Sequence, residues 1–128
     1  MRFLFIDSFL DVENFGMDLL GIGYLSSVLK KEGHEVEVED INSWCRVQET
    51  ANTFQPHFIC FGVRTGSTQY KLLINRKPRK QLPGVYSIFG GPHATFFPEM
   101  IEEEGVDAIC RGEGEEAIVD FVRRFEKG

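Results

Sequence analysis

The sequence predicts an α/β fold in which helices cover both faces of a parallel sheet. Along its 128 residues, five short strand-like segments alternate with five segments whose apolar residues recur at helical spacing. Such alternation is typical of parallel strands joined by right-handed crossovers. The length suits a single domain over residues 1–128 with one main core.

The first strand and helix have clear boundaries. Phe3–Ile6 is a continuous apolar run closed by Asp7, which is typical of a strand buried on both faces. Residues 8–18 mix acidic, amide and apolar residues without a regular period, so we expect a loop there. Apolar residues at helical spacing then predict a helix that begins near Leu19 and stops at Gly33.

The second and third strands differ in polarity. In residues 35–41 valines alternate with glutamates, which predicts a strand with one solvated face at a sheet edge. Residues 58–63 are the most apolar run and are expected at the sheet centre. A helix is predicted over residues 43–53. The helix after residue 68 should end or kink at Pro78, because proline lacks an amide proton and clashes with the preceding turn.

The remaining segments complete the sheet. Strands are predicted at residues 85–89 and 106–110, separated by a loop and by a short helix that starts at Pro98. The last helix follows the turn Arg111–Gly114 and keeps amphipathic spacing. The simplest arrangement is a three-layer, flavodoxin-like (Rossmann-like) parallel five-stranded sheet of order 2-1-3-4-5, which leaves the acidic second strand at an edge.

A glycine pair marks a candidate ligand-binding rim. Gly90 and Gly91 follow the fourth strand, where bare backbone lets a flat ligand approach, and open α/β sheets bind ligands at that edge. The loops at residues 7–21 and 64–68 should wall the crevice between the first and third strands. Residues 66–68 offer amides and hydroxyls near a helix start. The alternative for each loop is a plain tight turn or helix cap.

Composition excludes several classes of function. The net charge of −6 supplies no basic field for nucleic acid. No apolar run is long enough for a membrane span, and the amino terminus does not read as a signal peptide, so a cytoplasmic protein is expected. The three cysteines, Cys45, Cys60 and Cys110, are odd in number and widely spaced, and we expect them reduced and buried.

Three other ligand classes are disfavoured. Gly21-Ile22-Gly23 imitates a dinucleotide fingerprint but has Ser26 in place of the third glycine, and glycine here is expected to let the helix pack closely on the sheet. A phosphoacceptor receiver would need an acidic third-strand end and a lysine after the fifth strand, where Arg64 and Arg111 stand instead. A flavin phosphate would be repelled by the acidic residues 7–18.

The histidines and acidic residues indicate binding and not catalysis. His34 and His57 precede strands and should lie on solvated surface at the opposite edge. His93 lies at the rim and is expected to contact a ligand, but one histidine does not make a metal site. Glu113 and Glu115 suit the positive end of a helix. Since spacing pairs no nucleophile with a base, the chain reads as a binding module.

Three motifs in register point to one family. They are Leu20–Leu25 with Gly33–Val36, then Gly90–Thr95, then Arg111–Glu116. Together they resemble the N-terminal cobalamin (B12)-binding domain of B12-dependent radical S-adenosylmethionine (radical SAM) enzymes, in the family's order and over nearly the whole chain.

The resemblance implies the flavodoxin-like fold and cobalamin as cofactor, with the corrin ring over the strand-end loops and the nucleotide tail in the crevice. The resemblance implies cobalamin contact for Thr65, Gly66, Ser67, Gly90, Gly91 and His93. The neighbouring residues that we also expect to contact cobalamin are Leu20, Gly21, Thr68, Pro92, Gly112 and Glu113.

The resemblance also bears on the cobalt ligand. B12 domains of the methionine synthase and mutase type carry Asp-x-His-x-x-Gly after the first strand, and that histidine binds cobalt. Here Asp11–Gly16 matches with Glu13 at the histidine position, and a register through Gly21 places Asp18 there. The resemblance therefore implies cobalamin bound base-off without a histidine ligand. A water, an empty position or an unusual side chain remains open for the lower axial site.

The radical enzymes of this family also hold a 4Fe-4S cluster through Cys-x-x-x-Cys-x-x-Cys. Here 14 residues separate Cys45 from Cys60 and 49 separate Cys60 from Cys110, so no such cluster is local. We expect an isolated N-terminal domain or a fragment, with S-adenosylmethionine and the cluster in a radical SAM barrel in cis. The parent is expected to be a methyltransferase or cyclase, and this chain alone is not expected to be catalytic. The alternative is a cofactor-free docking domain, which large side chains plugging the slot beside Gly90 and Gly91 would favour.

Overall fold

The computed structural model describes residues 1–7, 17–63, 66, 68–112 and 114–128. Its strands are β1 (Arg2–Asp7), β2 (Glu35–Asp40), β3 (Phe58–Gly62), β4 (Tyr86–Gly90) and β5 (Ala108–Ile109). Its helices are α1 (Met17–Lys31), α2 (Trp44–Phe54), α3 (Thr68–Gln81), α4 (Pro92–Phe96), the 3-10 helix η3 (Pro98–Glu102) and α5 (Glu115–Glu126). Within these described residues no helix is both long and apolar enough to cross a membrane.

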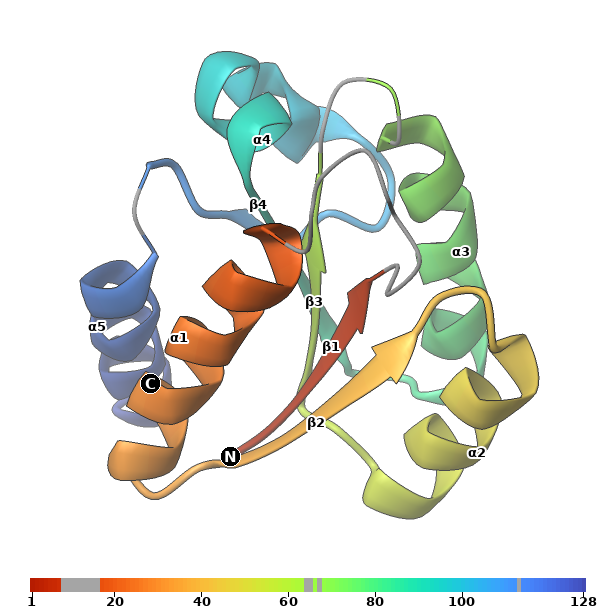
Figure 1. Cartoon of the computed structure of the whole chain (residues 1–128), viewed down its shortest axis with the longest axis horizontal. Helices are drawn as coiled ribbons and strands as arrows, with labels where there is room; N and C mark the ends of the chain where they lie inside the picture. Colours follow the sequence, from red (N-terminus) through yellow and green to blue (C-terminus); the bar gives the residue numbers. More distant parts are fainter. Residues whose placement is uncertain (8–16, 64–65, 67, 113) are drawn as a thin grey trace.

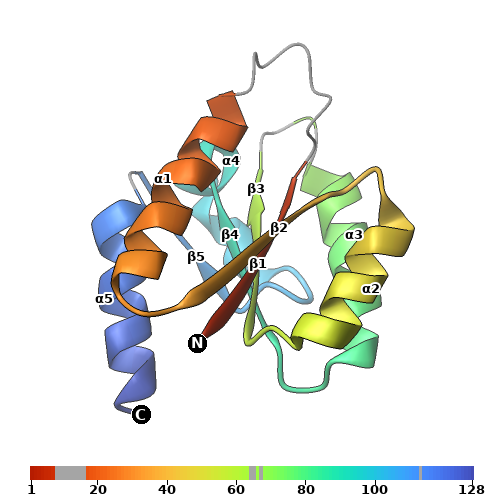
Figure 2. The same ribbon diagram turned by 60° about the horizontal axis from the view of Figure 1, so that its bottom comes forward.

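The described strands form one parallel sheet in the order β2-β1-β3-β4-β5. Helices α1 and α5 lie side by side on one face, and α2 and α3 cover the other (Figures 1 and 2). The predicted flavodoxin-like topology is therefore confirmed. Both termini lie toward the end of the sheet where β1 begins (Figure 2).

Alternate strand residues build two cores, because successive side chains point to opposite faces of a sheet. Under α2 and α3 the buried strand residues are Leu4, Ile6, Ile59, Phe61 and Phe89. Under α1 and α5 they are Phe3, Phe5, Phe58, Cys60 and Ile88. The rings of Phe3 and Phe58 stack at 4.9 Å, so β1 and β3 are joined by aromatic contact as well as by backbone hydrogen bonds.

The polarity of each strand matches its place in the sheet. In β2, Glu35 and Glu37 are exposed while Val36 and Val38 are half-buried against the core under α1 and α5. In β3, the run from Phe58 to Phe61 is buried. The edge and central positions predicted for these strands are confirmed.

Of the two outcomes predicted at Pro78, an end or a kink of the helix, the structure contradicts the end. Helix α3 continues to Gln81, and Pro78 is completely buried. Proline cannot donate the hydrogen bond to the carbonyl four residues earlier and crowds the preceding turn, and α3 nevertheless continues for three residues beyond it. The carbonyl of Pro78 still accepts a hydrogen bond from the Leu82 amide at 3.0 Å, which closes the last turn.

The segment between β4 and β5 also differs from the prediction. Residues 90–95, predicted as a loop, contain α4, which begins at Pro92 directly after Gly91. The helix predicted from Pro98 is the 3-10 helix η3. The fifth strand is two residues long, although the amide of Cys110 still donates to the Phe89 carbonyl at 2.8 Å. Proline at a first helical position predicts a helix start, and it occurs twice here within seven residues.

His34 and His57 do not lie on plain solvated surface as predicted. His34 Nδ1 accepts a hydrogen bond from the Met1 amino group at 2.8 Å, and His57 Nδ1 accepts one from the Arg2 amide at 2.9 Å. Both rings are half-buried. Burial, followed by the nearby positive charge, lowers the pKa of each histidine. They fix the amino-terminal end of β1.

The cysteines are free, as predicted, but only Cys60 is buried. Cys110 is half-buried and Cys45 is exposed on α2. The prediction of burial was therefore wrong for Cys45 and overstated for Cys110, because α2 presents Cys45 on its solvent side while Val47 and Ala51 face the core.

Candidate functional site

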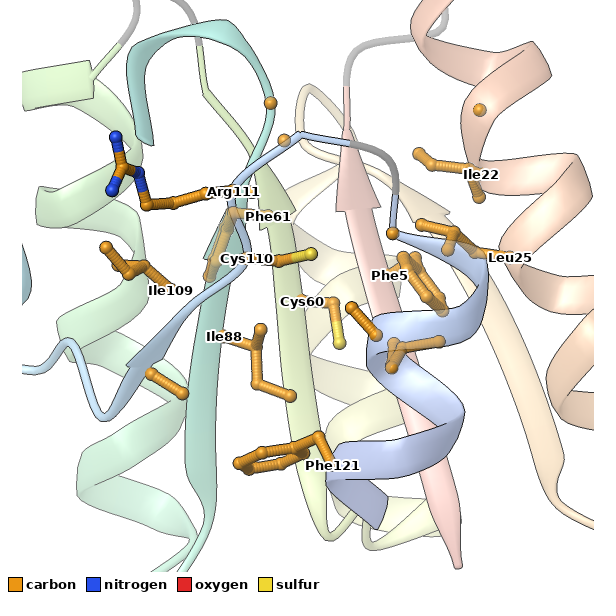
Figure 3. Close-up of a pocket in the computed structure, with 18 of the residues that line it drawn as sticks. Phe5, Ile22, Leu25, Cys60, Phe61, Ile88, Ile109, Cys110, Arg111 and Phe121 are labelled. Carbon is orange, nitrogen blue, oxygen red and sulfur yellow. The ribbon is translucent and has the colours of Figure 1, made fainter. Parts of the chain in front are cut away.

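A cavity of about 310 Å³ lies between the sheet and helices α1 and α5 (Figure 3). It is at the small end of the range of roughly 300–1,000 Å³ that is usual for small-molecule sites. The sheet contributes Phe5, Cys60, Ile88 and Ala108; α1 contributes Gly21, Ile22 and Leu25; and α5 contributes Ala117, Ile118 and Phe121. The cavity runs from the carboxyl ends of the strands down along the sheet toward Phe121 (Figure 3).

The upper end of the cavity is built from small residues and strand ends. Asp7, Gly62, Gly90, Gly91 and Gly114 line it there. A mostly apolar cavity that no side chain fills therefore opens at the rim that the glycine pair predicts. The walls that the structure describes are α1 and α5. Most of the two loops that the prediction placed beside the crevice lies outside the described residues.

The predicted contact residues have different positions. Gly21, Gly90 and Gly91 line the cavity. The described residues Gly66, Thr68, Pro92, His93 and Gly112 are not part of its lining. Leu20 lies in the first turn of α1. Thr65, Ser67 and Glu113 lie outside the described residues. Contact of these residues with a cofactor stays a prediction.

His93 is held at the rim by its backbone and its ring. Its amide donates to the Val63 carbonyl at 3.0 Å, and its ring stacks on Phe97 with 4.9 Å between centroids. The side chain is half-buried. These contacts fix α4 against the end of β3.

The glycines of α1 do not serve close packing on the sheet, contrary to the prediction. A Cβ atom at Gly21 would have no heavy atom within 4 Å, and the same holds at Gly23. Both residues are exposed, but only Gly21 borders the cavity. Glycine at position 21 therefore leaves space over the cavity.

Gly91 is required by the local backbone. Its φ is +95°, and a Cβ atom there would lie 3.0 Å from the Val63 carbonyl oxygen and 3.1 Å from its nitrogen. Gly90 uses its carbonyl to accept the Val63 amide at 2.8 Å. The turn after β4 thus lies directly against the end of β3, where only glycine fits at position 91.

The turns after β4 and β5 are tied together through Thr95. The Thr95 hydroxyl donates to the Gly91 carbonyl at 3.0 Å and accepts from the Gly112 amide at 2.9 Å. Arg111 Nε donates to the Thr95 carbonyl at 3.1 Å. Although Arg111 borders the cavity, its guanidinium points away from the sulfur atoms of Cys60 and Cys110 (Figure 3).

A buried ion pair that was not predicted from the sequence lies next to the rim, at the carboxyl ends of β1 and β3. Asp7 Oδ1 lies 3.0 Å from Lys71 Nζ, and the side chains are 3% and 7% exposed. Lys71 Nζ also donates to the Gly62 carbonyl. The pair joins the ends of β1 and β3 to α3. The sequence did carry one signal for the burial of Lys71. This residue directly precedes the buried Leu72 and lies four residues, about one helical turn, before the buried Asn75, so it shares their face of α3.

Two thiols border the cavity and offer a direct probe of it. The Cys60 and Cys110 side chains both point into it (Figure 3). Burial raises the pKa of the Cys60 thiol, and burial together with nearby Glu115 raises that of Cys110. Both thiols are therefore protonated near neutral pH and weakly nucleophilic.

The three cysteines of the folded protein should differ in their rates of alkylation. Cys45 should react with iodoacetamide first because it is exposed, Cys110 more slowly, and Cys60 only on unfolding. A ligand in the cavity should slow the alkylation of Cys110 further and leave the alkylation rate of Cys45 unchanged. Peptide mass spectrometry over a time course measures all three. Equal rates for Cys110 with and without a ligand that binds would place that ligand elsewhere.

Comparison with known proteins identifies the family. The sequence model of the family described as B12 binding domain matches residues 11–122. The chain belongs to the B12-binding domain family. The cobalamin-binding domain inferred from the three motifs is thereby confirmed, and cobalamin is the cofactor of this family.

Curated relatives are much longer than this B12-binding domain. One, described as an uncharacterized methyltransferase of Pyrococcus horikoshii, is 28% identical over 85% of this chain and 25% of the relative. An anaerobic magnesium-protoporphyrin IX monomethyl ester cyclase of Cereibacter sphaeroides is 30% identical over 82% of this chain and 18% of the relative. The cyclase of the same name from Rubrivivax gelatinosus is 27% identical over the whole chain and 25% of the relative. The chain spans about a quarter or less of these proteins.

Proposed function

We propose that the domain binds cobalamin base-off, with the nucleotide tail in the cavity and the corrin ring over the glycine rim. The observation that carries the proposal is the vacant apolar cavity that opens at Gly21, Gly90 and Gly91 in a B12-binding domain. The cavity is far too small for a corrin macrocycle but suits one bicyclic aromatic group. Only the base of the tail meets that description.

The positions of the histidines support a cobalt without a histidine ligand from this chain. None of the chain's three histidines lines the cavity, and the one at the rim, His93, has its ring stacked on Phe97 with 4.9 Å between centroids. His34 and His57 are engaged at the start of β1, at the opposite end of the sheet from the rim.

When bound, cobalamin supplies a cobalt centre able to carry a methyl group. The residues of this chain bind and orient it. Phe5 and Phe121 offer aromatic contacts along the cavity, and Gly21 leaves room above it. The bond from Arg111 to Thr95 keeps together the two rim turns that would support the corrin ring.

We assign the domain as the cofactor module of a radical SAM methyltransferase-type enzyme, with the catalytic domain in cis. The lengths of the relatives and their names, a methyltransferase and two cyclases, support this. On α4, which begins directly after the rim residue Gly91, Phe96 is 77% exposed, and an aromatic side chain there is available for contact with a second domain.

The cofactor-free docking alternative would be favoured by large side chains that plug the slot beside Gly90 and Gly91. Leu25 and Phe121 border the cavity but leave about 310 Å³ vacant. A Cβ atom at Gly21 would still meet nothing within 4 Å. The open cavity therefore favours a bound cofactor.

Retention of pigment tests the proposal. The purified chain, mixed with hydroxocobalamin and desalted, should keep about one corrinoid per chain with a shifted visible spectrum. After reduction to cob(II)alamin, the electron paramagnetic resonance spectrum should lack splitting by an axial nitrogen, since neither the tail base nor a histidine coordinates cobalt. Complete loss of pigment on desalting would contradict cobalamin binding. An axial nitrogen signal would contradict the base-off, histidine-free arrangement.

A further inference from the structure

We infer that the cavity selects among corrinoids by their lower base, accepting an apolar aromatic base and rejecting a purine. The inference rests on the proposed function and adds a specificity to it. It follows from the chemistry of the cavity wall, since corrinoids differ from one another chiefly in the base that the tail carries.

The lower part of the cavity is bordered by hydrocarbon. Phe5, Ile88 and Ile118 are 4%, 7% and 8% exposed and belong to one core cluster, and Ala108 and Phe121 pack against it. None of these side chains donates or accepts a hydrogen bond. Part of the backbone is also committed there, because β4 pairs with β3 on one side and with β5 on the other, and the Ile118 amide donates to the Gly114 carbonyl at 2.8 Å.

Polar groups that border the cavity are already engaged or weak. Asp7 is held by Lys71 at 3.0 Å near the upper end. Arg111 bonds to the Thr95 carbonyl and points away from the interior (Figure 3). Cys60 and Cys110 offer protonated thiols, which are poor hydrogen-bond partners.

A base that enters this cavity leaves its water behind. The ring nitrogens and exocyclic amine of adenine would lose their hydrogen bonds to water and find none in the lower cavity described here, which is costly for each group. Released from cobalt, 5,6-dimethylbenzimidazole has one free ring nitrogen that loses its hydrogen bond to water, fewer polar groups than adenine has, and its methyl groups and benzene ring gain contact with Phe5 and Phe121. We expect at least a tenfold preference for the benzimidazole corrinoid.

The test compares three corrinoids on the whole chain by equilibrium dialysis: cobalamin, the cobamide that carries adenine, and cobinamide, which has no nucleotide. Cobalamin should bind at least tenfold more tightly than either of the others. Equal affinity for cobalamin and the adenine cobamide would overturn the inference and leave cobalamin binding intact. Equal affinity for cobinamide would show that the tail does not enter the cavity, and would overturn it too. If no corrinoid binds, the proposed function fails first.

Cobalamin and the adenine cobamide also differ in how strongly their own base binds cobalt, which affects the measured affinities. Comparing two variants of the protein with the same two corrinoids cancels this difference. Ala108→Thr and Ala108→Val have nearly the same shape and differ in one hydroxyl, and position 108 is a half-buried strand residue that borders the cavity. The ratio of affinities for cobalamin and the adenine cobamide should fall at least threefold in Ala108→Thr relative to Ala108→Val. The same ratio in both variants would show that the cavity does not discriminate between bases by their polarity.

Discussion

Gly21→Leu should weaken cobalamin binding at least tenfold, about 1.4 kcal/mol, while leaving the domain folded. The leucine side chain would extend over the cavity from a position where a Cβ atom meets nothing within 4 Å, so the free protein has room for it but the nucleotide tail does not. Because leucine favours helix more than glycine does, the free energy of unfolding should rise by about 0.5–1 kcal/mol. Equilibrium dialysis and urea denaturation measure the two effects.

Gly23→Leu is the matched control. Gly23 lies in the same helix, is exposed, and has equally open surroundings, but it does not border the cavity. It should gain the same helical stability and keep full affinity. Equal loss of affinity in both variants would mean that the α1 surface, and not the cavity, binds cobalamin. Unchanged affinity in Gly21→Leu would contradict entry of the tail between α1 and α5.

Lys71→Met should lower the free energy of unfolding by about 3–5 kcal/mol, because it leaves the Asp7 carboxylate buried beside no ammonium group. The Asp7 side chain is only 3% exposed, and Lys71 Nζ lies 3.0 Å from it. Since small domains are stable by roughly 5–15 kcal/mol, this loss is a large share of the total. Urea denaturation of the free protein measures it.

The control is a second ion pair, which is exposed to solvent. Arg124 Nε lies 2.9 Å from Asp120 Oδ2, but the side chains are 79% and 63% exposed. Arg124→Met should cost less than about 1 kcal/mol. In the double variant Asp7→Asn, Lys71→Met, the loss should be smaller than the sum of the single losses, because the charge left behind is also removed. Additive losses would show that the two side chains do not interact.

The topology was predictable because each strand carries its own polarity. The apolar run at Phe58–Phe61 belongs at the centre of a parallel sheet and the alternating β2 at an edge, and both positions follow from burial alone. The glycine rim was predictable for the same reason, since Gly90 and Gly91 end a strand whose place in the sheet was known.

The cavity walls were harder to predict because they depend on how two helices pack. Nothing local in α1 or α5 indicates that Gly21 and Ala117 border the same space, since they come together only through the order of the strands. Lys71 reads as a solvated lysine in an otherwise polar helix, and its burial follows from the distant Asp7 and Gly62. Pro78 led to a wrong helix end because tertiary packing can offset the local cost of proline, and Pro78 is completely buried.

The two edges of the sheet limit how copies of the domain meet. At one edge, β2 presents the exposed carboxylates of Glu35 and Glu37, and at the other β5 pairs over only two residues. A second copy aligned along β2 would bring rows of negative charge together, and one aligned along β5 would find almost no strand to extend. Charged or very short edges are the usual means by which natural sheets resist growth into fibrils. The molecule can therefore hold an open apolar cavity at high concentration without polymerising through its strands.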